Sequence, residues 1–165
     1  CYYVAGNHER WVEYTDEIKE LISSCGATVV SDTSVNLGDN ITLYGIDDPL
    51  FYPNEGFFGA ISSLSPDKDK FNILLSHRPE YAPVYGEYGF NLTLCGHAHG
   101  GQVRIPLLLN GLYAPHQGWF PKYAGGNYSF DDGSHVIVSR GLMIDNLPRV
   151  FDPPELVIVN ITPAK

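Results

Sequence analysis

The strongest constraint on the fold is a series of short apolar runs that recur along the chain between Gly, Pro, Asp and Asn residues. Each run has four to seven residues and is rich in Leu or β-branched side chains, a pattern typical of strands. Some runs, such as residues 73–75 and 136–138, do not alternate with polar residues, which indicates strands covered on both faces. The expected strands are residues 1–4, 27–31, 41–46, 71–76, 92–96, 135–139 and 155–161.

Residues 15–25 form the clearest helix in the sequence. Thr15 is placed to cap its first turn, which also carries acidic residues at the positive end of the helix. Apolar residues at helical spacing predict one buried stripe, made up of Ile18, Leu21, Ile22 and Cys25. Gly26 can provide the left-handed stop. With shorter helices expected around residues 56–64 and 80–88, the elements predict an α/β fold with a layered sheet core.

Composition limits the class of protein further. With 165 residues, 44% of them apolar, the chain is long enough for one ordinary domain with a packed core. Asp and Glu number 19 against 10 Lys and Arg, and the net charge of −9 disfavours binding to the phosphate backbone of nucleic acids. Cys1, Cys25 and Cys95 are an odd, widely spaced set, which predicts neither a disulfide framework nor a zinc knuckle.

Polar residues follow three of the expected strands, at the point where each strand ends. They are Asn7, His8, His77, His97 and His99. In layered α/β folds, sites assemble at this rim of the sheet. Imidazole is the commonest protein ligand for Zn, Mn, Fe, Ni and Co, and an amide oxygen suits the harder of these ions. The set therefore points to a divalent metal site.

The spacing of His97 and His99 adds to this interpretation. In an extended segment, side chains two residues apart leave on the same side, so both could serve one ion or two adjacent ions. Two ions ~3.5–4 Å apart clamp a phosphoryl group and lower the pKa of a bridging water. A lone histidine is more often a hydrogen-bonded structural residue than a ligand, and His116 and His135 are interpreted in that way.

Taken together, the motifs carry a resemblance to a known family. GNHE, then a histidine after an apolar strand, then GHAHGG, in this order and spacing, resemble the calcineurin-like metallophosphoesterases. The stretches GHAHGGQVRIP, KYAGGNY, VIVSRGL, LPRVF and PPELVIVNI resemble a bacterial membrane-associated or exported branch related to UDP-2,3-diacylglucosamine diphosphatases. The resemblance covers residues 3–162 and implies the C-terminal part of a layered β-sandwich with flanking helices.

The resemblance also implies roles for individual residues. Asn7, His77 and His97 would ligate one metal ion, and His99 would ligate the other. His8 would meet the phosphate and help the leaving oxygen depart, which is general-acid catalysis. The implied cofactors are two divalent ions, Mn, Zn or Fe. The implied substrate is a phosphoester or pyrophosphate of the nucleotide-sugar lipid or phospholipid type.

Further polar residues are weaker candidates. Arg140 follows a strand and could bind a phosphate as a fork donor, with an ion pair to a carboxylate as an equally good alternative. Gln102 and residues 100–101 could present amide groups near the metals. Asp47 and Asp48 also follow a strand, but a role in capping a turn is the favoured interpretation.

The sequence departs from the family pattern in one respect. The DxH and GDxxD motifs that the family places before GNH do not occur in that position here. The four ligand candidates are therefore all neutral, and nothing among them offsets the repulsion between two divalent ions. We expect residues 1–165 to be the C-terminal half of a phosphoesterase domain whose missing N-terminal half is its partner. This half alone would hold at most one ion weakly and lack activity.

Two other interpretations stay open at this stage. The chain could be a non-catalytic metal-binding or interaction module, with exposed sheet surface through which two copies could pair. It could also be a phosphodiesterase, a protein phosphatase or a nuclease of the same superfamily, although the acidic composition argues against a nuclease. The location of this chain is not predicted. The resemblance implies a membrane-associated or exported bacterial parent protein.

Overall fold

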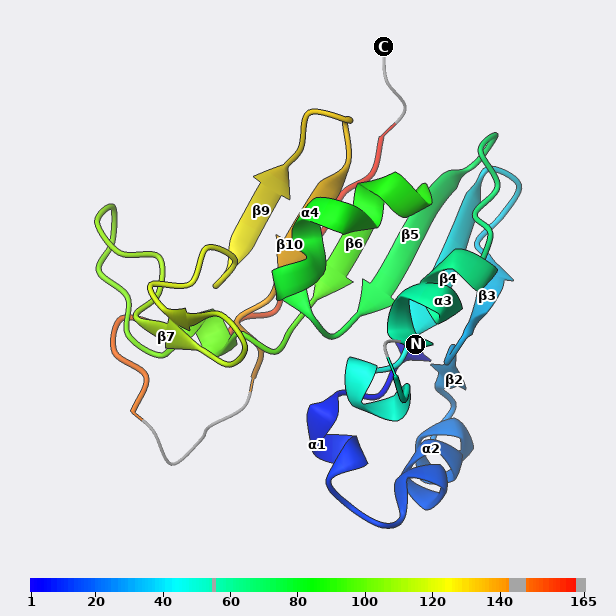
Figure 1. Ribbon diagram of the computed structural model, residues 1–165, viewed down its shortest axis with the longest axis horizontal. Helices are drawn as coiled ribbons and strands as arrows, with labels where there is room; N and C mark the ends of the chain where they lie inside the picture. Colours follow the sequence, from blue (N-terminus) through cyan, green and yellow to red (C-terminus); the bar gives the residue numbers. More distant parts are fainter. Residues whose placement is uncertain (55, 143–147, 163–165) are drawn as a thin grey trace.

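The computed structural model describes residues 1–54, 56–142 and 148–162, and its centre is a mixed six-stranded sheet (Figure 1). The strands lie in the order β3 (Thr33–Asn36), β4 (Ile41–Ile46), β5 (Phe71–Ser76), β6 (Leu92–Cys95), β10 (His135–Val138) and β9 (Gly126–Ser129). The four central strands are parallel, and β3 and β9 join them antiparallel at the two edges. The α/β fold expected from the sequence is therefore confirmed.

Two small sheets flank the central one. β1 (Tyr2–Tyr3) pairs in parallel with β2 (Thr28–Val29), and β7 (Tyr113–Ala114) pairs antiparallel with β8 (Gly118–Trp119). The chain after β1 is tied to the end of β4, because the Ala5 amide donates to Asp47 Oδ1 over 2.8 Å and the Asp48 amide donates to the Ala5 carbonyl over 2.9 Å. This link places the segment that follows β1 beside the ends of the central strands.

The helices are short. They are α1 (Asn7–Arg10), α2 (Thr15–Ser24), α3 (Gly56–Ser63) and α4 (Ala82–Tyr85), with 3₁₀ turns η1 (Pro49–Phe51), η2 (Pro79–Tyr81), η3 (Gly86–Tyr88) and η4 (His99–Gly101). The helices expected near residues 56–64 and 80–88 are confirmed as α3 and as the run from η2 to η3. Within the described residues, no helix has the length and apolar character needed to cross a membrane.

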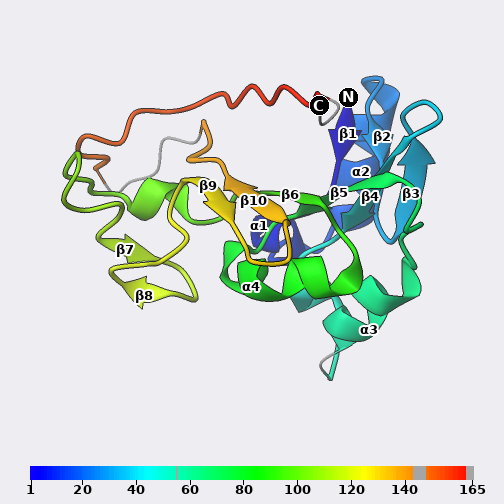
Figure 2. The ribbon, with the colours of Figure 1, turned by 90° about the horizontal axis from the view of Figure 1, so that it is seen from above.

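The main core lies between the sheet and helices α3 and α4, which cover the same face (Figure 2). Strand residues such as Ile46 and Leu74 are fully buried there, and they pack with Phe57, Ile61 and Tyr85 from the helices. Burying an Ile, Leu or Phe side chain contributes about 1.5–3 kcal/mol. This face therefore anchors the strands whose ends carry the polar residues.

The opposite face carries a smaller apolar cluster around Leu43, Ile73 and Leu92. The C-terminal segment runs along this side (Figure 2). Residues 155–161 are not a strand, which contradicts the expectation from the sequence: Leu156 is 81% exposed and Ile158 is 80% exposed. Strand formation depends on a neighbouring strand as well as on side-chain pattern. No strand of the described chain pairs with this segment.

Helix α2 has nearly the expected bounds, but its buried stripe is wrong. Leu21 is 63% exposed and Cys25 is exposed, while Ile18 and Ile22 are only partly covered. The physical reason is that α2 lies against β2 and α1 at the margin of the molecule, away from the six-stranded sheet. Thr15 is also not the N-cap, because that position is Tyr14.

Candidate metal centre

The carboxyl ends of the parallel strands meet at one edge of the sheet, and polar side chains gather there. His77 follows β5 and His97 follows β6, while Asn7 is the first residue of α1. Gly6 lets these elements approach closely: a Cβ atom at this position would lie 2.9 Å from Cε1 of His77. Only glycine leaves room for the imidazole so close to the backbone.

Asn7, His77 and His97 form a tight triangle of donor atoms, which we name the neutral cluster. Asn7 Oδ1 lies 2.9 Å from His77 Nε2 and 3.1 Å from His97 Nδ1, and the two ring nitrogens lie 3.2 Å apart. An amide oxygen only accepts, and each neutral imidazole nitrogen either donates or accepts. Whichever nitrogens carry protons, at least one of the three contacts is not a hydrogen bond. A cation among the three atoms would resolve this conflict.

The two histidines of the cluster are neutral at neutral pH. Burial lowers the pKa of His77 to about 4. Burial, and then the neighbouring His77, lower the pKa of His97 to about 2. Removing a ring from water disfavours its charged form, so these imidazoles keep a lone pair that a metal ion can use.

His8 and His99 lie at the cavities beside the cluster. His8 is exposed and stacks on Trp11, with ring centroids 4.6 Å apart. Together with His97, both histidines line two cavities of about 270 and 370 Å³. The extended geometry assumed for the His97–His99 pair is wrong, because both residues have left-handed backbone, with φ of 65° and 48°. The tight turn into η4, and not a strand, sets the direction of the two rings.

The acidic residues after β4 have structural roles. Asp48 Oδ1 accepts from the Leu50 amide over 3.0 Å and so caps η1. Both Asp48 oxygens also accept from the buried Arg78 guanidinium. Asp47 accepts from Ala5 and from the Ser31 hydroxyl. The capping interpretation is confirmed for Asp48. It is wrong for Asp47, whose carboxylate instead binds donors from distant segments of the chain, Ala5, Lys19 and Ser31.

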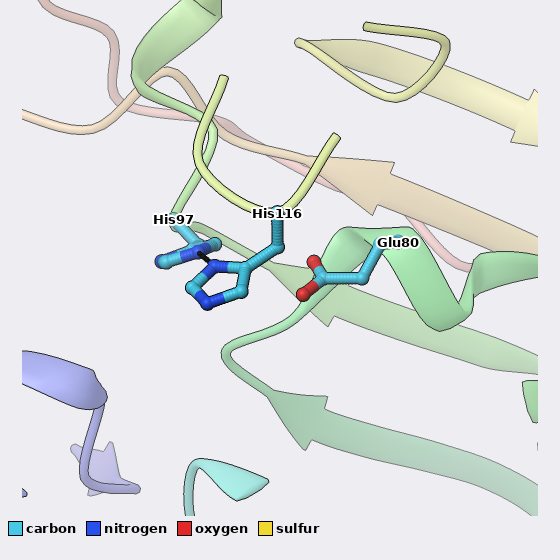
Figure 3. Close-up of side chains that lie close together, drawn as sticks. All are labelled: Glu80, His97 and His116. Atoms are coloured by element: carbon cyan, nitrogen blue, oxygen red, sulfur yellow. Dashed lines mark hydrogen bonds between the residues drawn. The ribbon is translucent and has the colours of Figure 1, made fainter. Parts of the chain in front are cut away.

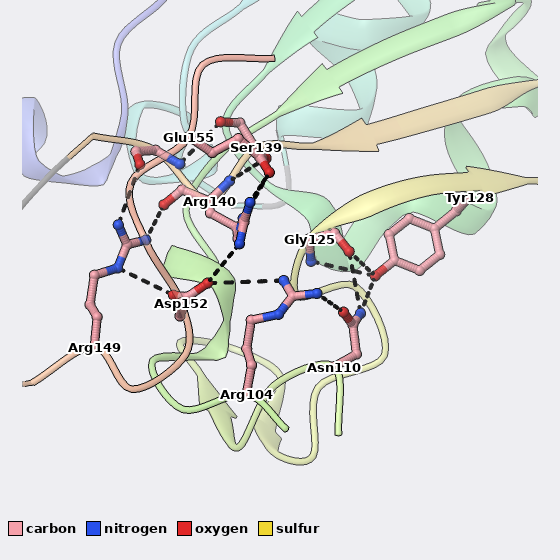
Figure 4. Close-up of polar contacts among 10 residues, drawn as sticks. Arg104, Asn110, Gly125, Tyr128, Ser139, Arg140, Arg149, Asp152 and Glu155 are labelled. Atoms are coloured by element: carbon pink, nitrogen blue, oxygen red, sulfur yellow. Dashed lines mark hydrogen bonds and ion pairs between the residues drawn. The ribbon is translucent and has the colours of Figure 1, made fainter. Parts of the chain in front are cut away.

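A second group of polar residues lies next to the neutral cluster, and we name it the arginine cluster (Figure 4). It consists of Arg104, Arg140, Arg149, Asp152 and Glu155. Asp152 is fully buried, with guanidinium nitrogens of the three arginines 3.2–4.0 Å from its carboxylate. Arg140 also pairs with Glu155, so the ion-pair alternative for this residue is the one observed. Arg140 nevertheless lines the 270 Å³ cavity with His77 and His97, and phosphate binding stays a prediction.

Gly100 and Gln102 lie in the loop that begins with the GHAHGG motif. A Cβ atom on Gly100 would lie 2.0 Å from Asp152 Oδ1, so this glycine lets the loop pack directly on the arginine cluster. Gln102 lines the larger cavity, and its buried Oε1 atom has no hydrogen-bond partner within the described residues. A role for Gln102 near a metal is thus untested and stays a prediction.

Comparison with known proteins shows the family to which the chain belongs. It is 33% identical to the metallophosphoesterase YkuE of Bacillus subtilis over 98% of its own length and 55% of that protein. It is 30% identical to the phosphodiesterase YaeI of Escherichia coli over 83% of its length. The UDP-2,3-diacylglucosamine pyrophosphatase LpxG of Chlamydia muridarum is 28% identical over 79% of the chain. The chain belongs to the metallophosphoesterase family.

No family model and no solved structure matches the chain. This metallophosphoesterase chain spans about half of the length of these three curated relatives, from 40% for LpxG to 55% for YkuE. The family name implies binding of divalent metal. The neutral cluster suits that purpose in donor type and spacing, whereas the assignment of each residue as a ligand stays a prediction.

Sequence reasoning does not single out two residues that lie beside the neutral cluster, His116 and Glu80. The sequence predicts an ordinary structural role for His116, but its Nδ1 lies 2.9 Å from Nε2 of His97. Glu80 directs its carboxylate towards the same two rings (Figure 3), and possible ligand atoms of the three residues lie within 4.8 Å of one another. His116 comes from the turn between β7 and β8, and no motif or periodicity in the sequence marks that turn.

Proposed function

We propose that the full-length protein hydrolyses phosphoesters with divalent metal held by Asn7, His77 and His97. The observation that carries this proposal is the triangle of donor atoms, whose three short contacts cannot all be hydrogen bonds. Adjacent ligand atoms bound to one ion at about 2.0–2.2 Å lie roughly 2.8–3.6 Å apart, the lower end for octahedral and the upper end for tetrahedral coordination. The observed separations of 2.9, 3.1 and 3.2 Å fit this requirement.

The charge of the site sets the number of ions that these residues can hold. All three donors are neutral, and the nearby Asp47, Asp48 and Glu80 are engaged in other contacts, Glu80 with the Arg78 guanidinium. Two divalent ions at close range repel each other strongly unless carboxylates offset their charge. We therefore infer that the described residues account for one ion, Mn, Zn or Fe, and that a second ion, with His99 as a ligand, needs carboxylates from elsewhere in the full-length protein.

Bound metal would polarise the phosphoryl oxygens and lower the pKa of a water molecule. The exposed ring of His8 lines both cavities that reach His97, which supports a role as the general acid. From there it can donate a proton to the oxygen that leaves phosphorus. Arg140 lines one of these cavities and can orient a phosphate through its guanidinium.

The proposed substrate carries both a phosphate and an apolar part. Leu142 lines one cavity, and Trp11, Tyr113 and Pro115 line the other, so apolar groups flank the polar donors. The relative LpxG is named for a pyrophosphatase that acts on a diacylated UDP-sugar. We propose a nucleotide-sugar lipid or a phospholipid-type phosphoester as the substrate class.

The test is a hydrolysis assay with bis(p-nitrophenyl) phosphate and Mn²⁺. We expect His77→Asn and His97→Gly to remove turnover in the full-length protein, and His135→Asn, on the exposed end of β10, to retain it. Residues 1–165 alone should bind Mn²⁺ weakly and turn over little substrate. Undiminished turnover in His97→Gly contradicts the proposed centre. Metal binding without turnover in the full-length protein favours a non-catalytic metal-binding module.

The role of His8 can be tested separately through the leaving group. Nitrophenolate leaves readily without a proton, whereas an alkoxide needs one, so a general acid matters most for alkyl phosphoesters. His8→Gln should therefore reduce hydrolysis of an alkyl phosphodiester far more than that of the nitrophenyl ester. Equal losses on both substrates would assign His8 to another task.

A further inference from the structure

His97 has two ring nitrogens, and the structure gives each a different neighbour. Nδ1 faces Asn7 and His77, and Nε2 faces Nδ1 of His116 over 2.9 Å. A neutral imidazole that offers one nitrogen to a metal carries its proton on the other nitrogen. Because His97 is only 4% exposed, that N–H group needs a protein acceptor. His116 Nδ1 is in the position of this acceptor.

The turn that carries His116 is held firmly. Gln117 accepts from the Tyr123 amide over 2.9 Å and donates to the Tyr123 carbonyl over 3.0 Å. Leu112, just before β7, donates to the carbonyl of Gly101 in η4 over 3.0 Å. His116 itself has a left-handed backbone, with φ of 60°, which is uncommon for a residue other than glycine. Such strain persists where the surrounding structure imposes it, often at functional sites.

Glu80 adds a negative charge to the outer side of this pair. One of its oxygens accepts from Arg78 over 3.1 Å, and the other is buried without a hydrogen-bond partner in the described part of the chain. Arg78 is fixed in turn by an ion pair with Asp48. Figure 3 shows the carboxylate of Glu80 directed towards the rings of His97 and His116. When a cation binds to His97, the ring of His97 becomes more positive. The negative charge of Glu80 beside the His97–His116 pair stabilises that change.

We propose that His116, supported by Glu80, is a positioning residue: its Nδ1 accepts a hydrogen bond from the Nε2–H group of His97. The Nδ1 lone pair of His97 then faces Asn7 and His77. This inference rests on the proposed function. A second metal ion bound by Glu80, His97 and His116 is the competing arrangement. It would require His97 to ligate through both nitrogens, which needs an imidazolate and the loss of a further proton.

The experiment compares Co²⁺ binding by full-length variants. His116→Gly removes the acceptor without backbone strain, and His116→Asn returns an acceptor oxygen to nearly the same place. Phe120→Gly is the matched control, because Phe120 follows β8, also has a left-handed φ of 57° and is 68% exposed. We expect His116→Gly to weaken Co²⁺ binding about 10- to 100-fold and to change the visible spectrum of the bound ion.

The other variants complete the test. His116→Asn should recover most of the affinity and the spectrum, Glu80→Gln should weaken binding less than tenfold, and Phe120→Gly should match the wild type. Wild-type affinity and spectrum in His116→Gly would overturn the inference. So would the loss of one whole equivalent of Co²⁺ in both His116→Gly and Glu80→Gln, because these residues would then be ligands.

A second readout separates this inference from the proposed function. Ring ¹⁵N chemical shifts of the metal-free protein report which nitrogen of His97 carries the proton. We expect Nε2–H in the wild type and a mixture of tautomers in His116→Gly. If the wild type binds no Co²⁺ but shows this change, the proposed function fails and the positioning of His97 stands. Nδ1–H in the wild type would overturn the positioning.

Discussion

The neutral cluster and the arginine cluster are both built from polar side chains at the same end of the sheet, but they satisfy those side chains in opposite ways. In the arginine cluster, three cations face the carboxylates of Asp152 and Glu155, so each charge has a partner within the chain. In the neutral cluster, three donor atoms face one another without any charge between them. The first arrangement brings opposite charges together, although neither oxygen of Asp152 is hydrogen-bonded within the described residues. The second arrangement brings neutral donors together and calls for a cation.

The largest effect that we expect comes from breaking the arginine cluster. Asp152→Asn removes the one fully buried carboxylate among three arginines and should lower the free energy of unfolding by about 3–5 kcal/mol. Urea unfolding measures this loss. Asp131→Asn, at an exposed position, should stay within about 0.5 kcal/mol of the wild type. A loss below about 1 kcal/mol for Asp152→Asn would show that the arginines do not depend on this residue.

The neutral cluster should make the metal-free protein sensitive to acid. In the unfolded chain, a histidine binds its proton near pH 6.5, whereas His77 in the folded protein does so near pH 4. Between these values the unfolded state binds more protons, so the stability that His77 contributes is complete above pH 6.5 and is lost as the pH falls towards 4. The loss should be about 3 kcal/mol.

Urea unfolding at several pH values, with a chelator present, measures this effect. Because carboxylates titrate over part of the same range, the quantity to compare is the difference between the wild type and His77→Asn. His135→Asn should follow the wild-type profile. If His77→Asn keeps the full acid sensitivity, burial of His77 is not its origin.

Metal should stabilise the protein through the neutral cluster alone. At a Mn²⁺ concentration one hundred times the Kd, binding to the folded state should raise the free energy of unfolding by about 2.7 kcal/mol. Thermal unfolding with and without Mn²⁺ measures the gain. His97→Gly should abolish it, whereas Arg140→Gln should retain it. An equal gain in His97→Gly would place the metal elsewhere.

The smallest effect on stability should come from Arg140, which belongs to the arginine cluster but reaches the cavity of the neutral cluster. Arg140→Gln should cost about 1 kcal/mol or less, because the partner Glu155 is one-quarter exposed. It should also raise KM for a phosphodiester. Glu155→Gln removes the same ion pair but keeps the guanidinium, so its KM should not rise. Unchanged KM in Arg140→Gln would leave that residue with a structural role only.

The parts of the fold that the sequence predicts are those that its local pattern specifies. β4, β5, β6 and β10 are short runs rich in Leu and β-branched residues between turn residues, a pattern typical of buried central strands. Once these strands are parallel, their ends must meet at one edge. The convergence of the residues that follow them could therefore be expected.

The remainder depends on contacts between distant segments. Residues 155–161 have the composition of a strand, yet no described strand pairs with them. Glu80 and His116 meet only because the β7–β8 turn packs on η4, where a Cβ atom on Gly101 would lie 2.4 Å from the Gly111 Cα atom. Two glycines ten residues apart are too weak a pattern to predict from the sequence that these two segments pack together.

The left-handed backbone at His97 and His116 has a practical consequence. Glycine adopts this conformation freely, so replacing either histidine with glycine removes a ring and leaves the chain in place. The gap then has the size and polarity of free imidazole. Imidazole added to the solution could occupy it and restore metal affinity in proportion to its concentration, and the centre would become one that a small molecule turns on and off.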